Sequence, residues 1–340
     1  MSQRPNAYDV AKLAGVSQTT VSRVLNNFPH VRPTTKEKVL EAIEKLGFEP
    51  DEIARSLVKK KTNTIGLIVG NLANPFYSET AQAILNEASK VDYDVIMMEG
   101  DSNNISLSEV IGKLINRRVE GVVVASVKRN DDELTKVLTE KSIPVIFFNR
   151  TLDHAVNTNY IVVDNLKGSK LAMEHLIQSG HKKIAYITGW QGYSTFNDRF
   201  LGYKQALAEN NLAYDGNLVF EVNPKGSALD FSMDLLRNNP DVTAFFASTD
   251  SIALEILEAA SRCNKRVPED VSVIGFDNIN ISSNPYVKLT TVSQRKEEMS
   301  VLALTNLLKL INKEVETPVQ ITLEPELIVR GTTTAKDRNL

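Results

Sequence analysis

The hydrophobic positions of the first thirty residues recur at helical spacing in two short blocks separated by Gly15. Glycine suits the turn between them because a residue without Cβ adopts left-handed backbone at little cost. Ser17 can cap the second block by accepting a hydrogen bond from a backbone N–H two or three residues further on. The pattern predicts two helices, over 8–13 and from Ser17 onward, with these residues facing inward: Val10, Ala11, Ala14, Val21, Val24 and Leu25.

The outward positions of the second helix are polar. In a helix-turn-helix, the second helix places its N-terminal residues against base edges in the major groove, where Gln pairs with adenine and Arg holds guanine through two bonds. Gln18, Thr19 and Arg23 occupy such positions. A small helical hairpin with a solvated face explains this motif equally well when it is taken alone. The candidate DNA-binding residues of this region are Tyr8, Ser17, Gln18, Thr19, Thr20, Ser22, Arg23, Asn26 and His30.

A third helix follows. Thr34 or Thr35 is expected to cap it, an apolar stripe from Val39 to Leu46 closes a small core against the first two helices, and Gly47 ends it. These helices together predict an all-α head.

Residues 51–58 form a short amphipathic segment. Asp51 can cap it, and Ile53, Ala54 and Leu57 fall on one stripe. So few apolar residues cannot hold an isolated helix, so this segment is expected to be helical only with a partner.

The pattern of apolar residues changes after the polar run 59–64. Apolar runs typical of buried strands alternate with helical patterns, which predicts parallel sheets wound with helices on both faces. Residues 62–335 exceed one sheet of usual size, so two subdomains with a cleft between them are expected. The strands are expected at 65–69, 95–98, 121–125, 145–148, 184–187, 243–247 and 271–274, and helices include 78–90, 168–179 and 251–263.

Charge is unevenly divided along the chain. Residues 1–61 contain eleven Lys and Arg against seven Asp and Glu, net +4, and the remainder carries −7 of the total of −3. A basic head on an acidic body suits contact with phosphates at one end. The single cysteine, Cys263, excludes an internal disulfide, and the polar N-terminus has no signal-peptide or membrane-span pattern, so a cytoplasmic protein is expected. The four histidines lack metal-ligand spacing, so they are expected at surface or turn positions, with no metal.

The motifs as a set resemble the lactose and galactose repressor family of bacterial transcriptional regulators. The resemblance is dense in YDVAKLAGVSQTTVSRVLN and VRPTTKEKVLEAIEKLGFEPDEIARSL and continues in TIGLIVGNLANPFYSE, RRVEGVVV, DRFLGYKQAL and VPEDVSVIGFDN. It covers about residues 5–333. The resemblance implies a homodimer that binds a pseudo-palindromic operator, with Ala54 and Leu57 of a hinge helix in the minor groove and Leu57 wedged between base pairs.

The same resemblance implies the domain limits. The helix-turn-helix headpiece is expected at 1–50, the hinge helix and linker at 51–61, the effector-binding and dimerisation body at 62–335, and a tail at 336–340. The body is expected to consist of two doubly wound subdomains of periplasmic-binding-protein type. They are assembled from about 62–162 with 293–322, and from about 163–292 with 323–335. No apolar heptads follow, so a dimer rather than a tetramer is expected.

A small-molecule effector is expected in the cleft, beyond the carboxyl ends of the strands. By resemblance, Arg199 grips it and Asp277 accepts its hydrogen bonds, and such an acceptor beside a fixed donor suits a sugar. Tyr193 replaces a basic residue of purine-binding relatives, which disfavours a nucleobase. Trp190 serves equally well as a stacking wall or as loop packing, and one of Phe76 and Tyr77 is as well explained by core packing. The candidate effector-binding residues are Phe76, Tyr77, Ser126, Trp190, Tyr193, Arg199, Thr249 and Asp277.

The sequence contains no catalytic triad in motif context, no phosphate-binding GxxxxGK[ST] loop and no metal cluster, so neither an enzyme nor a cofactor is expected. The leading hypothesis is therefore a sequence-specific, sugar-controlled repressor. One alternative is a regulator of the same family that takes a phosphorylated carrier protein as co-repressor. A distant alternative is a periplasmic-type sugar-binding protein, which would need a signal peptide and no head.

Overall fold

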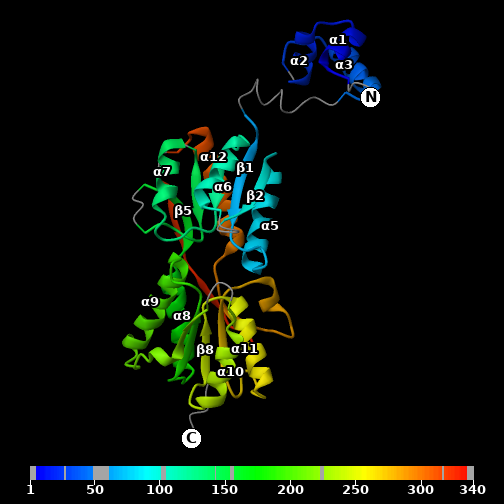
Figure 1. Ribbon diagram of the computed structural model, residues 1–340. Helices are drawn as coiled ribbons and strands as arrows, with labels where there is room; N and C mark the ends of the chain where they lie inside the picture. The colour runs from blue at the N-terminus through cyan, green and yellow to red at the C-terminus, as the bar shows by residue number, and fades with distance from the viewer. Residues whose placement is uncertain are drawn as a thin grey trace. The chain divides into compact units, whose positions relative to one another are not determined.

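The computed structural model describes residues 5–26, 28–48, 61–100, 105–141, 143–153, 157–222, 226–315 and 318–334. The chain divides into two compact units, Met1–Thr62 and Asn63–Leu340, here called the head and the body. Figure 1 shows the helices of the head and the two α/β lobes of the body. The fold class that the sequence predicts is confirmed.

The head consists of α1 (Ala7–Ala14), α2 (Gln18–Leu25) and α3 (Pro33–Leu46). Asn6 and Asp9 form a reciprocal capping box at the start of α1, and Gly15 ends that helix with φ +66°. Gly47 ends α3 in the same left-handed conformation. The core is completely shielded from solvent at Val10, Val21 and Val39.

The start of α3 differs from the prediction. The helix begins at Pro33, and its N-cap is Arg32, which makes no side-chain capping bond. Proline is preorganised for the first helical position and has no N–H to satisfy, so Thr34 and Thr35 fall inside the first turn instead of capping it.

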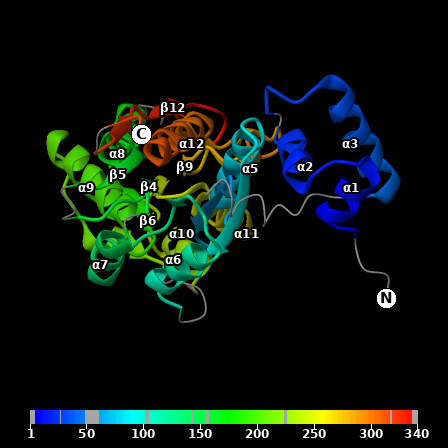
Figure 2. The ribbon, with the colours of Figure 1, turned by 90° about the horizontal axis from the view of Figure 1, so that it is seen from above.

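The first lobe of the body is built on a sheet of strand order β11-β5-β4-β3-β1-β2, and its strand pairs are all parallel. The strands are β1 (Thr64–Val69), β2 (Asp94–Glu99), β3 (Gly121–Val124), β4 (Val145–Phe148), β5 (Asn159–Val163) and β11 (Gln320–Leu323). The helices α5 (Pro75–Ser89) and α12 (Lys296–Asn312) cover one face and lie side by side (Figure 2). The opposite face is covered by α6 (Leu107–Asn116) and α7 (Asp132–Lys141).

The second lobe repeats this plan with the strand order β12-β10-β9-β8-β6-β7. Its edge strand β12 pairs antiparallel with β10, and the other pairs are parallel. The strands are β6 (Ile184–Thr188), β7 (Val219–Glu221), β8 (Ala244–Ala247), β9 (Ser272–Asp277), β10 (Thr290–Ser293) and β12 (Glu326–Ile328). The helices α8 (Asn165–Gln178) and α9 (Ser194–Glu209) pack on one face, and α10 (Leu229–Asn238) and α11 (Asp250–Arg262) pack on the other.

The chain passes between the two lobes three times, after β5, β10 and β11. Both lobes bury continuous apolar strands, as expected for sheets covered on both faces. The loops that follow the carboxyl ends of β1, β4, β8 and β9 meet where the lobes meet. The winding of the chain therefore brings residues far apart in sequence to one cleft. Of the described helices, none has the length and apolar character needed to cross a membrane.

Candidate functional site

The head presents the predicted reading residues on the outer face of α2. Gln18, Thr19, Ser22 and Arg23 are exposed, while Val21 and Val24 on the opposite face are buried. This division follows directly from the helical spacing of the apolar positions. Four side chains that can form hydrogen bonds therefore project together from one short helix.

Other predicted DNA-binding residues also serve the fold of the head. The Ser17 hydroxyl accepts a hydrogen bond from the backbone N–H of Thr20 at 3.2 Å and lies 2.9 Å from the Thr20 hydroxyl. The Asn26 amide donates to the carbonyl of Ser22 at 2.8 Å. These three residues therefore fix the ends of α2, whereas Tyr8 and His30 are exposed and available to a partner.

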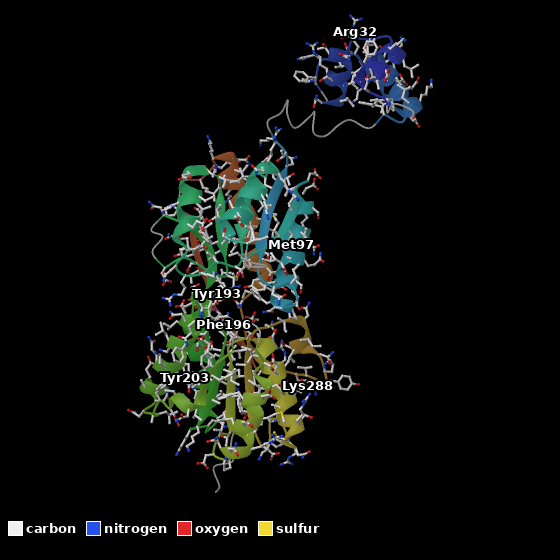
Figure 3. All side chains as sticks on the ribbon, in the orientation of Figure 1. Arg32, Met97, Tyr193, Phe196, Tyr203 and Lys288 are labelled. Atoms are coloured by element: carbon white, nitrogen blue, oxygen red, sulfur yellow. The ribbon has the colours of Figure 1, made fainter. Side chains whose placement is uncertain are left out.

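A groove of about 500 Å³ adjoins the C-terminal half of α2. Arg23, His30 and Arg32 give it a basic edge, and Figure 3 labels Arg32 on the head. Phe28 is 59% exposed and contributes an aromatic wall. Sequence reasoning missed Phe28 and Arg32, although both follow the recognition helix within ten residues. The hinge residues Ala54 and Leu57 lie outside the described residues.

The body contains a second candidate site, where the first lobe meets the second. Its cavity measures about 20 Å³, room for about one water molecule. Figure 3 labels Tyr193 and Phe196 at this junction. The cavity is lined by Asn74, Phe76, Tyr77, Asn149, Arg150, Thr195, Phe196, Arg199, Thr249, Asp277 and Gln294.

Arg199 is the central residue of the part of the site that the second lobe provides. Helix α9 carries its side chain beneath the cleft, where it is 2% exposed. Its Nε donates to Asn165 Oδ1 at 2.8 Å, and its Nη1 donates to the Ser248 carbonyl and to Asp277 Oδ1 at 3.3 Å. The guanidinium also stacks on the ring of Phe276 at 3.6 Å. These contacts hold the arginine in one orientation, which is what a fixed donor requires.

Asp277 ends β9 with a positive φ of 119°, a conformation rarely adopted outside glycine. Its Oδ1 accepts from Arg199 and from Gln294 Nε2, the latter at 2.6 Å. Burial raises the pKa of the Asp277 carboxyl to about 6, although Arg199 and Gln294 act in the opposite direction. Backbone strain and a buried carboxylate at one position are features found at ligand sites.

Asp250 fixes the loop that follows Asp277 through hydrogen bonds. Its side chain accepts hydrogen bonds from the N–H of Ile279 at 3.0 Å and from the hydroxyls of Ser282 and Thr291. Burial raises the pKa of Asp250 to about 7, with the charge of Asp277 as the second cause. The loop after β9 is therefore tied to α11 and β10, which fixes the direction of Asp277.

The first lobe contributes a second buried arginine. Arg150 follows β4, is 8% exposed, and donates from Nη1 to the Ser126 hydroxyl at 2.9 Å. Its guanidinium lies over the ring of Tyr193 at 3.6 Å and is 5.7 Å from the ring of Tyr77. Burial raises the pKa of Tyr77, while Arg150 acts in the opposite direction. Arg150 thus connects the first lobe to the aromatic side chains of the second.

The other predicted effector residues are placed as follows. Phe76 and Tyr77 belong to the core of the first lobe and also line the cavity. Thr249 lines it too, but its hydroxyl caps α11 by accepting from the N–H of Ile252 at 3.2 Å. Trp190 is 39% exposed and packs edge-on against Tyr193, outside the residues that line the cavity. Ser126 is not among the residues that line the cavity, and it contacts the site through Arg150.

Sequence reasoning missed Arg150, two residues after β4, and Gln294, directly after β10. Gln294 comes straight after β10 and is 1% exposed, so the strand-end rule identifies it once β10 is recognised. Arg150 follows Asn149, the first residue after β4, so the same rule points to this loop. Asn74 lies in the loop after β1 and follows the same rule, whereas Thr195 and Phe196 carry no comparable signal, because their position at the cavity depends on how the lobes meet.

Backbone contacts hold the lobes together on both sides of the cavity. The N–H of Arg129 donates to the Gly192 carbonyl at 2.9 Å, and the N–H of Thr151 donates to Ser194 Oγ at 3.0 Å. On the other side, the N–H of Asn280 donates to Glu79 Oε1 at 2.9 Å. Because ligand pockets for small molecules measure about 300–1,000 Å³, a sugar ring enters only when these contacts open or Arg150 turns away.

The histidines differ in part from expectation. His181 is buried, and its ring nitrogens lie 2.9 Å from Thr243 Oγ1 and 3.1 Å from Ser272 Oγ. It is therefore a hydrogen-bonded core histidine and not a surface one. Within the described part of the chain, no group of His, Cys, Asp and Glu side chains has a geometry that would hold a metal ion.

A helix-turn-helix head and a two-lobed α/β body with a polar cleft define a class of ligand-responsive DNA-binding proteins. The family description "Bacterial regulatory proteins, lacI family" matches residues 6–51, and "Periplasmic binding protein-like domain" matches residues 173–333. The probable HTH-type transcriptional repressor ExuR of Bacillus subtilis (strain 168) is 36% identical over 334 residues, covering 95% of this chain and 96% of the relative.

Solved structures of other transcriptional regulators have a similar fold. The lac repressor dimer bound to operator and the anti-inducer ONPF has a TM-score of 0.87 at 27% identity, covering 98% of this chain and all of that one. The transcriptional regulator CelR in complex with cellobiose has a TM-score of 0.72 at 32% identity, with 97% and 100% coverage. The chain belongs to the lacI family of bacterial regulatory proteins and is a DNA-binding transcriptional regulator. Members of this family are not enzymes, in agreement with the sequence prediction.

Proposed function

We propose that this regulator is a repressor whose dimer binds a pseudo-palindromic operator and whose DNA affinity is controlled by a sugar-like effector in the cleft. The observation that carries the proposal is the buried Arg199–Asp277–Gln294 group opposite the first lobe's Asn149. Within the described chain, Asn149 Oδ1 and Gln294 Oε1 have no hydrogen-bond partner. A buried polar atom without a partner costs about 1–3 kcal/mol, so a ligand that supplies several hydroxyl donors gains by meeting them.

A sugar suits this set because each hydroxyl both donates and accepts. Asp277 accepts from one hydroxyl, and Nη2 of Arg199 donates to another, since Nε and Nη1 are already engaged. Phe76 and Tyr77 provide the apolar wall against which a ring packs. Tyr193, Thr249, Ser126 and Trp190 shape the surroundings of the site.

DNA is read by the exposed face of α2. Gln18, Thr19, Ser22 and Arg23 contact bases, and Tyr8 and His30 contact the flanking backbone. The capping bonds of Ser17, Thr20 and Asn26 hold α2 in the orientation that the groove requires. Ala54 and Leu57 of the hinge segment enter the minor groove at the operator centre.

The two functions are coupled by the movement of the lobes. Effector binding favours one relative arrangement of the lobes, and that arrangement sets the separation of the two hinge segments in the dimer. When the two hinge segments are brought together they form helices, and the heads bind the operator. When the segments are held apart, the affinity for the operator falls. The effector acts as inducer or co-repressor according to the arrangement it prefers.

The effector is identified by screening sugars, sugar acids and sugar phosphates in a thermal-shift assay with the full-length protein. A ligand present at 100 times its dissociation constant adds about 2.7 kcal/mol to stability. Trp190 is the sole tryptophan of the sequence, so its fluorescence gives a second readout at the edge of the cleft. A panel with no effect on either readout refutes control by a sugar-like molecule.

The DNA role is tested by selecting the operator from random sequence and footprinting variants on it. Arg23→Ala and Leu57→Ala are expected to abolish specific protection while sedimentation still shows a dimer. Lys45→Ala is the matched control, since Lys45 is an exposed cation on the last turn of α3. Wild-type footprints from Arg23→Ala contradict the proposed reading face.

A further inference from the structure

The charged side chains that line the cavity do not balance. Arg150 and Arg199 are both more than nine-tenths buried, and Asp277 is the one carboxylate among the lining residues of the described chain. Asp277 pairs with Arg199. No described carboxylate lies within ion-pair distance of Arg150, although Arg129 nearby pairs with Asp153 at 2.6 Å. The cavity therefore encloses one positive charge in excess.

Burying a charge without a counter-charge is unfavourable, and proteins keep such groups buried where a partner arrives to neutralise them. Stacking on Tyr193 offsets part of the cost through the cation–π interaction. A ring face cannot, however, supply the in-plane acceptors that the N–H groups of a guanidinium need. Arg150 Nε is buried without a hydrogen-bond partner, which shows that the need is unmet.

The geometry of Arg150 says which part of the guanidinium is available. The hydrogen bond to Ser126 uses Nη1, so Nε and Nη2 remain along the opposite edge. That edge presents two parallel N–H groups, the pattern that binds a carboxylate or a phosphate through two hydrogen bonds. A neutral hydroxyl meets one of these donors and leaves the charge unbalanced.

We propose that the cleft selects an anionic sugar, one that carries a carboxylate or a phosphate group, and that Arg150 binds the anion. This inference rests on the proposed effector function of the cleft and names the chemical class of the effector. The second lobe holds the ring through Arg199, Asp277 and Gln294, while the first lobe holds the anionic group. One ligand therefore bridges the lobes, and its charge stabilises their closed arrangement.

The experiment compares neutral sugars with their acidic counterparts of the same stereochemistry. Glucose is tested against glucuronate and glucose 6-phosphate, and galactose against galacturonate and galactose 6-phosphate, by calorimetry and by Trp190 fluorescence at constant ionic strength. At least one acid binds about 10- to 100-fold more tightly than its neutral sugar, as expected for a charge-assisted bidentate contact. The uronate and phosphate series distinguish the two sources of the anion.

Variants assign the preference to Arg150. Arg150→Gln keeps a polar side chain and is expected to abolish the preference for the acid without lowering Tm, since it removes a charge that has no counter-ion. Arg129→Gln is the matched control, because Arg129 also lies where the lobes meet but outside the cavity and already ion-paired. It is expected to keep the preference.

Inorganic phosphate serves as a probe that does not depend on sugar stereochemistry. A saturable thermal shift is expected in the wild type and in Arg129→Gln, and none in Arg150→Gln. If a neutral sugar binds as tightly as its acid and Arg150→Gln changes nothing, the anion inference is wrong while the effector cleft stands. If phosphate acts equally on all three proteins and no sugar of either kind binds, both proposals fail.

Discussion

Replacing Arg199 with methionine tests whether the centre of the cleft is also part of the framework of the second lobe. The substitution keeps an unbranched side chain but removes the whole guanidinium, including its stacking on Phe276. It leaves the Asp277 carboxylate, which is 4% exposed at the side chain, without its ion-pair partner. It also removes the donors for Asn165 Oδ1 and the Ser248 carbonyl.

Removing one partner of a buried ion pair costs about 3–5 kcal/mol, since the other charge remains buried and uncompensated. For a unit of this size, about 2 °C of Tm is lost per kcal/mol, so Arg199→Met is expected to lower the Tm of the body by roughly 6–10 °C. Part of the cost is avoided when Asp277 takes up a proton, so the loss is larger at pH 8 than at pH 5. The double variant Arg199→Met/Asp277→Asn is expected to regain at least half of the lost stability.

Differential scanning calorimetry of the full chain, supported by urea unfolding followed through Trp190, measures these changes. Lys183→Met is the control, because Lys183 forms an ion pair with Asp241 at 3.0 Å in which both side chains are more than half exposed. Such pairs contribute about 0–1 kcal/mol. An Arg199→Met loss no larger than that of Lys183→Met, or a double variant no more stable than the single one, would refute the reasoning.

Four further predictions follow from particular residues. Effector affinity is expected to fall as the pH drops below about 6, the pKa to which burial raises the Asp277 carboxyl, because the protonated carboxyl releases its ion pair and stops accepting a second hydroxyl. The charged groups facing Asp277 are Arg199, Lys296 and Asp250. Calorimetric titration of the Asp277→Asn variant checks the assignment, because its effector affinity should not change with pH. Stability depends on pH in the opposite direction. Because the folded state keeps the Asp277 proton up to a higher pH than the unfolded state, the free energy of unfolding falls as the pH rises from about 4 through 6. Glu79→Ala removes the acceptor for a backbone N–H of the other lobe and is expected to weaken effector binding about 3- to 10-fold; unchanged affinity argues against lobe closure in binding. In Gly15→Ala the added Cβ meets no atom within 4 Å, but alanine is forced to φ +66°, so the free energy of unfolding of the head is expected to fall by about 1 kcal/mol. Gly112→Ala, in the middle of α6, has equal room and is expected to raise the free energy of unfolding by about 0.5–1 kcal/mol. Equal Tm shifts for the two variants contradict the backbone explanation.

The sequence predicts local structure well wherever one periodicity dominates. The apolar spacing of Val21 and Val24, together with Gly15 and the capping Ser17, defines α2 and its exposed face without reference to the rest of the chain. The buried strands of the body are equally legible, since parallel strands covered on both faces read as continuous apolar runs. The start of α3 was the exception, because Pro33 at the first helical position outweighed the capping tendency of Thr34 and Thr35.

The cleft marks the limit of such reasoning. Arg199 and Asp277 were found by resemblance, but their hydrogen bonds to each other, to Gln294 and to the Ser248 carbonyl join residues up to 78 positions apart in the chain. Arg150 could not be distinguished from a surface arginine, since its burial arises only when the first lobe meets the aromatic side chains of α9. The sequence by itself determined the elements, their apolar faces and the DNA-reading helix, because these depend on neighbours three or four residues away. The tertiary structure alone decided which charges are buried together in the cleft, because the energy of a charge depends on what surrounds it in space.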